Sequence, residues 1–216
     1  MEYVYHSIAF FNGGGPFMYP ILAVLAIGAA IGIERYITLH RITARNRSAW
    51  SSIQAALVAG DFEKARELTH QDDSVIARLL SQGLDRQGLV RRREDIETAM
   101  EESMLEIIPL LEKRTPYLAL GANIATLLGL LGTITGLISA FTAVSTTNPA
   151  EKADLLAASI SVAMNTTAFG LIVAIPLLIT NQVILSKTSA IIDSLEMAGL
   201  KALNVISANA KRRVEA

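Results

Sequence analysis

Three long stretches without a charged side chain constrain the fold of this chain of 216 residues more than any other feature. Aspartate, glutamate, lysine and arginine are all missing from Tyr3 to Ile33, from Thr115 to Ala150 and from Leu155 to Ser186. A helix that crosses a bilayer needs about 20 apolar residues, and hydrocarbon offers the backbone no water to bond. The blocks therefore predict an all-α integral membrane protein with three transmembrane helices.

Basic residues set the expected orientation of these helices. Of the 19 lysines and arginines, 13 lie within 34–115 and five lie after residue 186, whereas Lys152 alone lies between the second and third blocks. Positive charge near the ends of spans marks the cytoplasmic side. The predicted segments are an outer, interfacial N-terminus (1–16), the first span (17–33), a cytoplasmic helical region (34–115), the second span (116–145), an outer loop (146–153), the third span (154–186) and a cytoplasmic C-terminal helix (187–216).

The region between the first two spans carries signals for short helices. Ser48 and Ser74 are candidate N-caps, because a serine side chain can accept a bond from a free backbone N–H group of the first turn. Gly60-Asp61 is expected to end one helix and to open the next.

The apolar stripes of the second and third spans continue beyond the membrane. A helical period leads from Ile96 to Leu111 into the second span, so we predict one helix from about Glu94 to Val144, bent near Pro109 and Pro116. The third span continues its period into the C-terminal segment. Each stripe needs a partner to cover it, which predicts that both helices extend into a cytoplasmic helical bundle.

Small residues recur at a spacing of four in the second span, which lets helix backbones approach closely in lipid. Such packing is expected either inside one chain or between subunits of a ring, and the spacing favours neither. The candidate helix-packing residues are Gly121, Gly129, Gly132, Gly136, Gly170 and Pro176.

The third span contains a polar cluster that includes Asn165, Thr166 and Thr167. Serine and threonine in membrane helices often bond the preceding turn, but a side-chain amide is harder to satisfy in that way. The cluster favours a polar, hydrated seam. Because the apolar parts of the spans hold no carboxylate, lysine, arginine or histidine, water or a partner chain must supply the ionisable group if protons cross here.

Two motifs resemble the MotA/TolQ/ExbB family of ion-channel proteins. Gly-Leu-Leu-Gly-Thr-Ile-Thr-Gly-Leu at 129–137 is similar to the family's second-span motif. Thr-Ala-Phe-Gly-Leu at 167–171, followed by Ala-Ile-Pro at 174–176, is similar to its third-span motif. The three-span layout resembles ExbB and TolQ rather than the four-span MotA.

The resemblance implies a homopentameric ring in the bacterial inner membrane, with its N-terminus in the periplasm and its C-terminus in the cytoplasm. The ring would surround an ExbD/TolR-like single-span partner whose membrane aspartate binds the ion, and a TonB/TolA-like energy transducer would pass the work on. Thr133 and Thr167 match the threonines of the ion pathway, to which we add Thr166 and Asn165 as candidates. Val162 occupies a position where ExbB and TolQ relatives often carry glutamate.

The expected function is therefore ion-driven work at the periplasm or outer membrane, with H⁺ as the coupling ion and no cofactor. Thr166-Thr167 resembles the paired threonines of sodium-type flagellar stators, which leaves Na⁺ as an alternative, with Thr133, Thr166 and Thr167 as candidate ligands, since oxygen atoms suit a hard cation. A non-conducting membrane scaffold is the alternative from another class. An enzyme is not expected, since the sequence shows no nucleophile with a base, phosphate loop or metal-spaced histidines. Membrane lipids are expected contacts, and nucleic acid is not.

Overall fold

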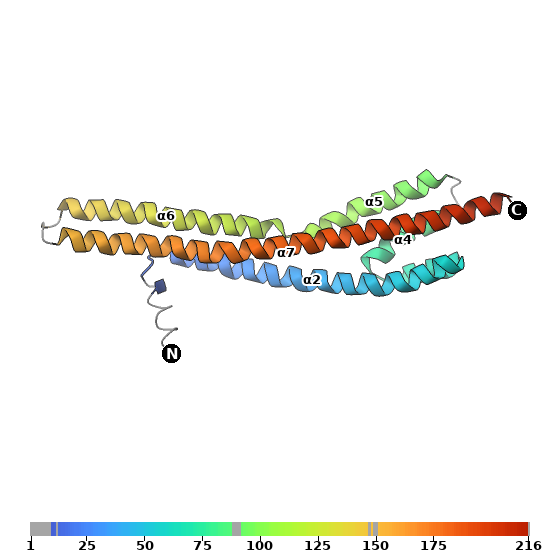
Figure 1. Ribbon diagram of the computed structural model, residues 1–216, viewed down its shortest axis with the longest axis horizontal. Helices are drawn as coiled ribbons and strands as arrows, with labels where there is room; N and C mark the ends of the chain where they lie inside the picture. Colours follow the sequence, from blue (N-terminus) through green and yellow to red (C-terminus); the bar gives the residue numbers. More distant parts are fainter. Residues whose placement is uncertain (1–9, 12, 88–91, 147, 149–150, 216) are drawn as a thin grey trace, which may run out of the picture. The chain divides into compact units, whose positions relative to one another are not determined.

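A computed structural model describes residues 10–11, 13–87, 92–146, 148 and 151–215. Its long elements are helices, which follow one another along the chain as shown in Figure 1: α2 (Met18–Ala59), α3 (Phe62–Gln71), α4 (Val75–Arg86), α5 (Arg93–Glu112), α6 (Pro116–Thr146) and α7 (Lys152–Glu215). Within the described residues, three helical stretches are long and apolar enough to cross a membrane: α2, the α5–α6 stretch and α7. The predicted all-α fold with three spans is confirmed. Parts of the predicted segments 1–16 and 146–153 lie outside the described residues.

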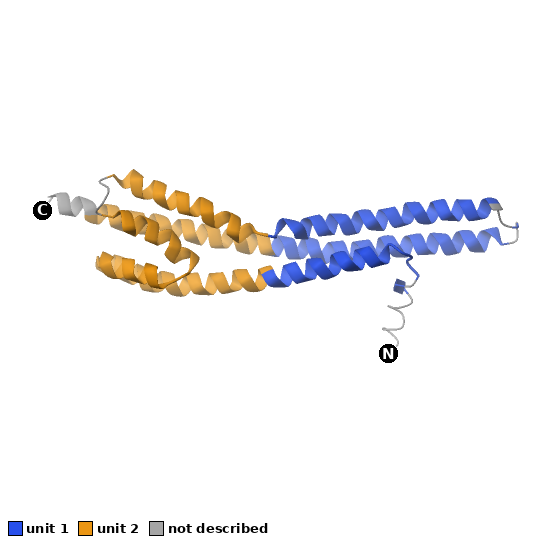
Figure 2. Ribbon diagram, turned by 180° about the vertical axis from the view of Figure 1, so that it is seen from behind, with its two compact units in different colours: residues 1–34, 114–183 blue, residues 35–113, 184–216 orange. Residues whose placement is uncertain are grey.

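The chain divides into two compact units, which Figure 2 colours separately. Unit 1 comprises residues 1–34 and 114–183, and unit 2 comprises residues 35–113 and 184–216. Helices α2 and α7 each contribute to both units, because two of the three boundaries fall inside these helices.

Unit 1 contains the apolar parts of α2, α6 and α7. Its interior holds small and branched side chains such as Ile21, Leu118 and Val173, all fully buried. Large apolar side chains also cover its outside: Phe141 is 67% exposed and Ile179 is 61% exposed. Such extensive apolar exposure would be a liability in water, whereas lipid tails are its natural surroundings.

Unit 2 contains α3, α4 and α5 with the remaining parts of α2 and α7. The predicted end of a helix at Gly60 is confirmed, since α2 ends at Ala59 and Gly60 has φ +76°. Asp61 Oδ1 accepts a hydrogen bond from the backbone N–H of Lys64, and Ser74 Oγ accepts one from that of Ala77. Both residues are N-caps, as the sequence predicts.

The apolar stripes predicted to leave the membrane are buried inside unit 2. The buried stripe residues of α5 are Ile96, Met100, Ile107 and Leu111, and those of α7 are Ile184, Ile191, Leu195, Ala198 and Leu203. These helices therefore cover one another's apolar faces, together with α4, whose Leu80 and Leu84 are also buried.

The prediction of one bent helix from Glu94 to Val144 is wrong. Helix α5 ends at Glu112, and α6 begins at Pro116. Between them Arg114 adopts φ 66°, a left-handed conformation that interrupts the helix. Pro116 suits the first position of a helix and disfavours helical geometry in the residue before it, so the chain breaks there. Pro109 remains inside α5.

The prediction that Ser48 caps a separate helix is also wrong. Helix α2 continues without a break from Met18 to Ala59, and the carbonyl oxygen of Ser48 accepts a hydrogen bond from Ser51 Oγ at 2.7 Å. No glycine or proline occurs in 34–59. A serine that could cap a helix does not begin one unless something ends the helix before it.

Arg35, which the charge pattern marks only as a basic residue beside a span, is buried with 4% exposure. Its guanidinium Nη2 donates a hydrogen bond to the carbonyl oxygen of Leu111, in the last turn of α5. The last carbonyls of a helix lack partners within the helix and attract positive charge. Arg35 therefore stabilises the end of α5 at the point where the chain breaks.

Replacing Asp61 by alanine is expected to destabilise unit 2 by about 1 kcal/mol, because the N–H group of Lys64 loses its acceptor. Urea unfolding followed by the fluorescence of Trp50, which lies in unit 2, measures this change. The control is Asp61→Asn, which keeps an acceptor oxygen and should cost much less. Equal losses in the two variants would contradict the capping role.

Candidate functional site

Helices α6 and α7 of unit 1 approach each other along a seam of small residues. A Cβ atom placed on Gly129 would lie 3.2 Å from the Cα atom of Thr167. One placed on Gly170 would lie 2.7 Å from the carbonyl oxygen of Ala125 and 3.2 Å from the Cα atom of Gly129. Since these neighbours are backbone atoms, which cannot rotate away, the close approach requires glycine at Gly170 and leaves only a tight fit for a larger residue at Gly129.

The same seam extends towards the end of α6. A Cβ atom on Gly136 would lie 2.7 Å from that of Ala163, and one on Gly132 would meet the side chain of Thr166. These small residues pack α6 on α7 within one chain. Gly121 differs, because a Cβ atom there would keep ordinary distances of 3.5 Å to Val24 and 3.7 Å to Leu177.

Pro176, the remaining candidate for helix packing, lies inside α7 and is exposed. The hydroxyl of Thr180 donates to its carbonyl oxygen at 2.8 Å. The structure thus places Pro176 away from the α6–α7 seam.

The hydroxyl groups of Thr133 and Thr167 both donate to backbone carbonyls. Thr167 Oγ1 bonds the carbonyl oxygen of Gly129 across the seam at 2.7 Å, and Thr133 Oγ1 bonds that of Leu130 in its own helix at 2.6 Å. Both side chains remain partly exposed. A hydroxyl has one donor and two acceptor lone pairs, so each oxygen can still accept from water or coordinate a cation.

Thr166 and Asn165 bind a different element, the glycine turn just before α2. Thr166 Oγ1 donates to the carbonyl oxygen of Gly14 and lies 2.9 Å from that of Val162, while Asn165 Nδ2 donates to the carbonyl oxygen of Gly13 at 3.5 Å. Thr166 is 1% exposed. The structure therefore separates the four candidate ion-pathway residues: Thr133 and Thr167 flank the seam, whereas Thr166 and Asn165 hold the turn.

Aromatic side chains just before the same turn pack against α7. Phe11 makes edge-on contacts with Phe169, at 5.8 Å between ring centroids, and with Tyr19, at 5.3 Å. Phe10 lies 6.4 Å from Phe169. Sequence reasoning missed these partners, although the glycine run ahead of the first span was a signal that the chain turns sharply there.

Val162 lies next to this turn. A Cβ atom on Gly15, which has φ +73°, would lie 3.3 Å from Val162 Cγ1. Val162 is 37% exposed, so the position where relatives often carry glutamate is apolar and partly accessible here. The side chains of Thr133, Asn165, Thr166 and Thr167 thus contribute neutral polar groups, and none of these four is an acid or a base.

The fold and the site define a membrane protein with three candidate spans and a polar, non-ionisable seam between two of them. Residues 71–197 match the model of the MotA/TolQ/ExbB proton channel family. Because this match covers more than half of the chain, the protein belongs to that family.

Individual relatives agree with this assignment. The biopolymer transport protein exbB1 of Vibrio cholerae is 49% identical over 53 residues, and the Tol-Pal system protein TolQ of Haemophilus influenzae is 40% identical over 78 residues. These alignments cover 24% and 36% of this chain, and only 23% and 34% of the relatives' own lengths. A putative ExbB-like biopolymer transport protein of Synechocystis is 27% identical over 167 residues, which cover 77% of this chain and 79% of the relative.

Proposed function

We propose that this protein is the ring-forming subunit of an ion-motive-force-driven motor in the bacterial inner membrane, similar to ExbB and TolQ. A homopentamer would surround an ExbD/TolR-like single-span partner, and H⁺ flow would be coupled to work at the periplasm or outer membrane. A TonB/TolA-like transducer would receive that work. The N-terminus would lie in the periplasm and the C-terminus in the cytoplasm, as the basic residues beside the spans suggest.

The observation that carries this proposal is that two partly exposed threonine hydroxyls on α6 and α7 already donate their hydrogens to backbone carbonyls. Thr133 and Thr167 donate their hydrogens to the carbonyl oxygens of Leu130 and Gly129, and their partly exposed oxygens keep lone pairs that can still accept a hydrogen bond. The blocks 115–150 and 155–186 contain no carboxylate, lysine, arginine or histidine that could carry the proton. A carboxylate from another chain would complete the pathway.

Two alternatives rest on specific observations. Oxygen atoms of threonine side chains and backbone carbonyls are suitable ligands for Na⁺, and the partly exposed hydroxyls of Thr133 and Thr167 are the candidate donors. Thr166, the third donor expected from the sequence, is buried and bonded to Gly14 instead. A non-conducting scaffold would explain why Thr166 and Asn165 hold the glycine turn. It would not explain the partly exposed hydroxyls of Thr133 and Thr167.

Proteoliposomes provide the direct test. The protein alone is expected to pass no ions, whereas the protein purified with its ExbD/TolR-like partner should acidify the lumen when a proton gradient is imposed, as read by a trapped pH-sensitive dye. The matched control is the partner with its membrane aspartate changed to asparagine, which should abolish flux. Flux that requires Na⁺ would select the sodium alternative, and no flux with the intact partner would favour the scaffold.

A further inference from the structure

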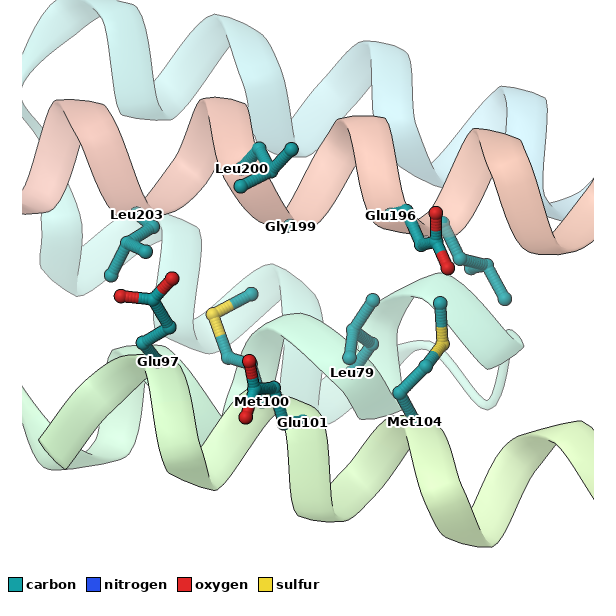
Figure 3. Close-up of a pocket in the computed structure, with 10 residues that line it drawn as sticks. Leu79, Glu97, Met100, Glu101, Met104, Glu196, Gly199, Leu200 and Leu203 are labelled. Carbon is teal, nitrogen blue, oxygen red and sulfur yellow. The ribbon is translucent and has the colours of Figure 1, made fainter. Parts of the chain in front are cut away.

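Unit 2 contains a pocket of about 270 Å³ between α4, α5 and α7, shown in Figure 3. Its floor is apolar and includes Leu79, Met100, Met104 and Leu203. Leu200, which is 55% exposed, lies at its edge. Methionine side chains are flexible and polarisable, so a floor of this kind adapts to the shape of an apolar group that enters it.

Three carboxylates surround this floor. Glu97 and Glu101 lie one turn apart on α5, and Glu196 approaches from α7 (Figure 3). The described residues that line the pocket include no lysine, arginine or histidine. Elsewhere on α5 the pattern differs, since Glu102 forms an ion pair with Arg86 at 3.6 Å. Among the described residues, none forms an ion pair with the three pocket carboxylates.

We propose that this pocket is a docking site for a cationic amphipathic helix of a partner chain. One apolar side chain of that helix enters the methionine-lined floor, and its lysines or arginines contact Glu97, Glu101 and Glu196. Helices commonly bind apolar grooves through such anchors, and long basic side chains lay their stems on apolar surface while the charge remains at the rim.

Size and charge select this occupant. A pocket of about 270 Å³ admits one or two side chains but not a complete helix, so the partner's backbone must run along the outside. Three negative charges at the rim repel phosphate groups, which argues against anionic lipid or nucleic acid. The inference goes beyond the proposed function, because docking here requires no ion flow.

The test measures peptide binding to the full-length protein in nanodiscs of zwitterionic lipid. The probe is a fluorescent helical peptide with a leucine stripe flanked by lysines, and the control peptide carries glutamate in place of each lysine. Fluorescence anisotropy should show binding of the lysine peptide only. Glu101→Lys is expected to weaken binding about tenfold, because it replaces an attraction by a repulsion.

The matched control is Glu106→Lys, which makes the same charge change at an exposed position of α5 outside the pocket and should leave affinity unchanged. Gly199→Leu tests the apolar component. A Cβ atom at Gly199 would lie 3.3 Å from the Cε atom of Met100, so the longer side chain fills the pocket and should also weaken binding.

Several outcomes would overturn the proposal. Equal binding of the two peptides would remove the charge argument, and equal losses in Glu101→Lys and Glu106→Lys would place the contact elsewhere. A change in the number of subunits per nanodisc in Glu101→Lys without peptide, together with unchanged peptide affinity, would assign the pocket to contact between copies of this chain.

Discussion

Gly170→Ala is expected to lower the melting temperature of the solubilised protein by about 5 °C and to abolish ion-driven activity. The added methyl carbon would lie 2.7 Å from the carbonyl oxygen of Ala125 and 3.2 Å from the Cα atom of Gly129. Because both are backbone atoms, α6 and α7 must move apart, and overpacking of this kind costs about 1–3 kcal/mol. The adjoining bond from Thr167 to Gly129 would lengthen with the seam.

Gly121→Ala is the control for this effect. It makes the same chemical change in the same pair of helices, but the new methyl carbon would lie 3.5 Å from Val24 and 3.7 Å from Leu177, at ordinary contact distance. Alanine also favours helix more than glycine does, by up to about 1 kcal/mol. Thermal unfolding followed by circular dichroism should therefore show no loss. If both variants melt alike, the close backbone approach at Gly170 does not limit stability.

Thr167→Val is expected to reduce ion flux about tenfold or more while leaving the protein folded. Valine has nearly the shape of threonine but lacks the hydroxyl that donates to the carbonyl oxygen of Gly129. Loss of one such bond costs about 1 kcal/mol of stability, whereas loss of an oxygen that contacts a charged species costs about 1.5–3 kcal/mol, which corresponds to tenfold or more in rate. The proteoliposome assay with the partner present measures the flux.

Three further variants separate conduction from packing. Thr167→Ser should restore flux, because it returns the hydroxyl. Thr180→Val removes a hydroxyl that bonds only its own helix and should leave flux unchanged. Thr166→Val should mainly destabilise, since Thr166 holds Gly14. Normal flux in Thr167→Val, with the protein stably assembled, would exclude Thr167 from the pathway.

Local signals were sufficient to predict much of the fold. The spans follow from uncharged blocks, because hydrocarbon leaves few alternatives to a helix. The starts of α3 and α4 follow from Asp61 and Ser74, whose capping bonds reach only three residues along the chain. The break before α6 was harder to predict, because Pro109 and Pro116 are both prolines within a helical pattern and either could interrupt the helix. The structure shows the break before Pro116, next to the bond from Arg35 to Leu111, and a bond between residues 76 positions apart is not visible in the local sequence.

The candidate site was less predictable than the fold. Motif similarity indicated Thr133 and Thr167, but it could not show that Asn165 and Thr166 bind Gly13 and Gly14, because the partners are 152 residues apart in the chain. Thr166 and Thr167 are adjacent in the sequence, yet they bond different elements, at Gly14 and Gly129. Spacing within a single span therefore cannot assign them to one role.

The direction of the two hydroxyl bonds restricts how a proton could move past the seam. A side chain relays a proton only if it accepts one hydrogen and passes on another, and the hydrogens of Thr133 and Thr167 are already directed at carbonyl oxygens. If the proposed pathway runs past these hydroxyls, water molecules beside them would point a hydrogen towards the two oxygens. The two threonines would then orient neighbouring water without relaying the proton themselves.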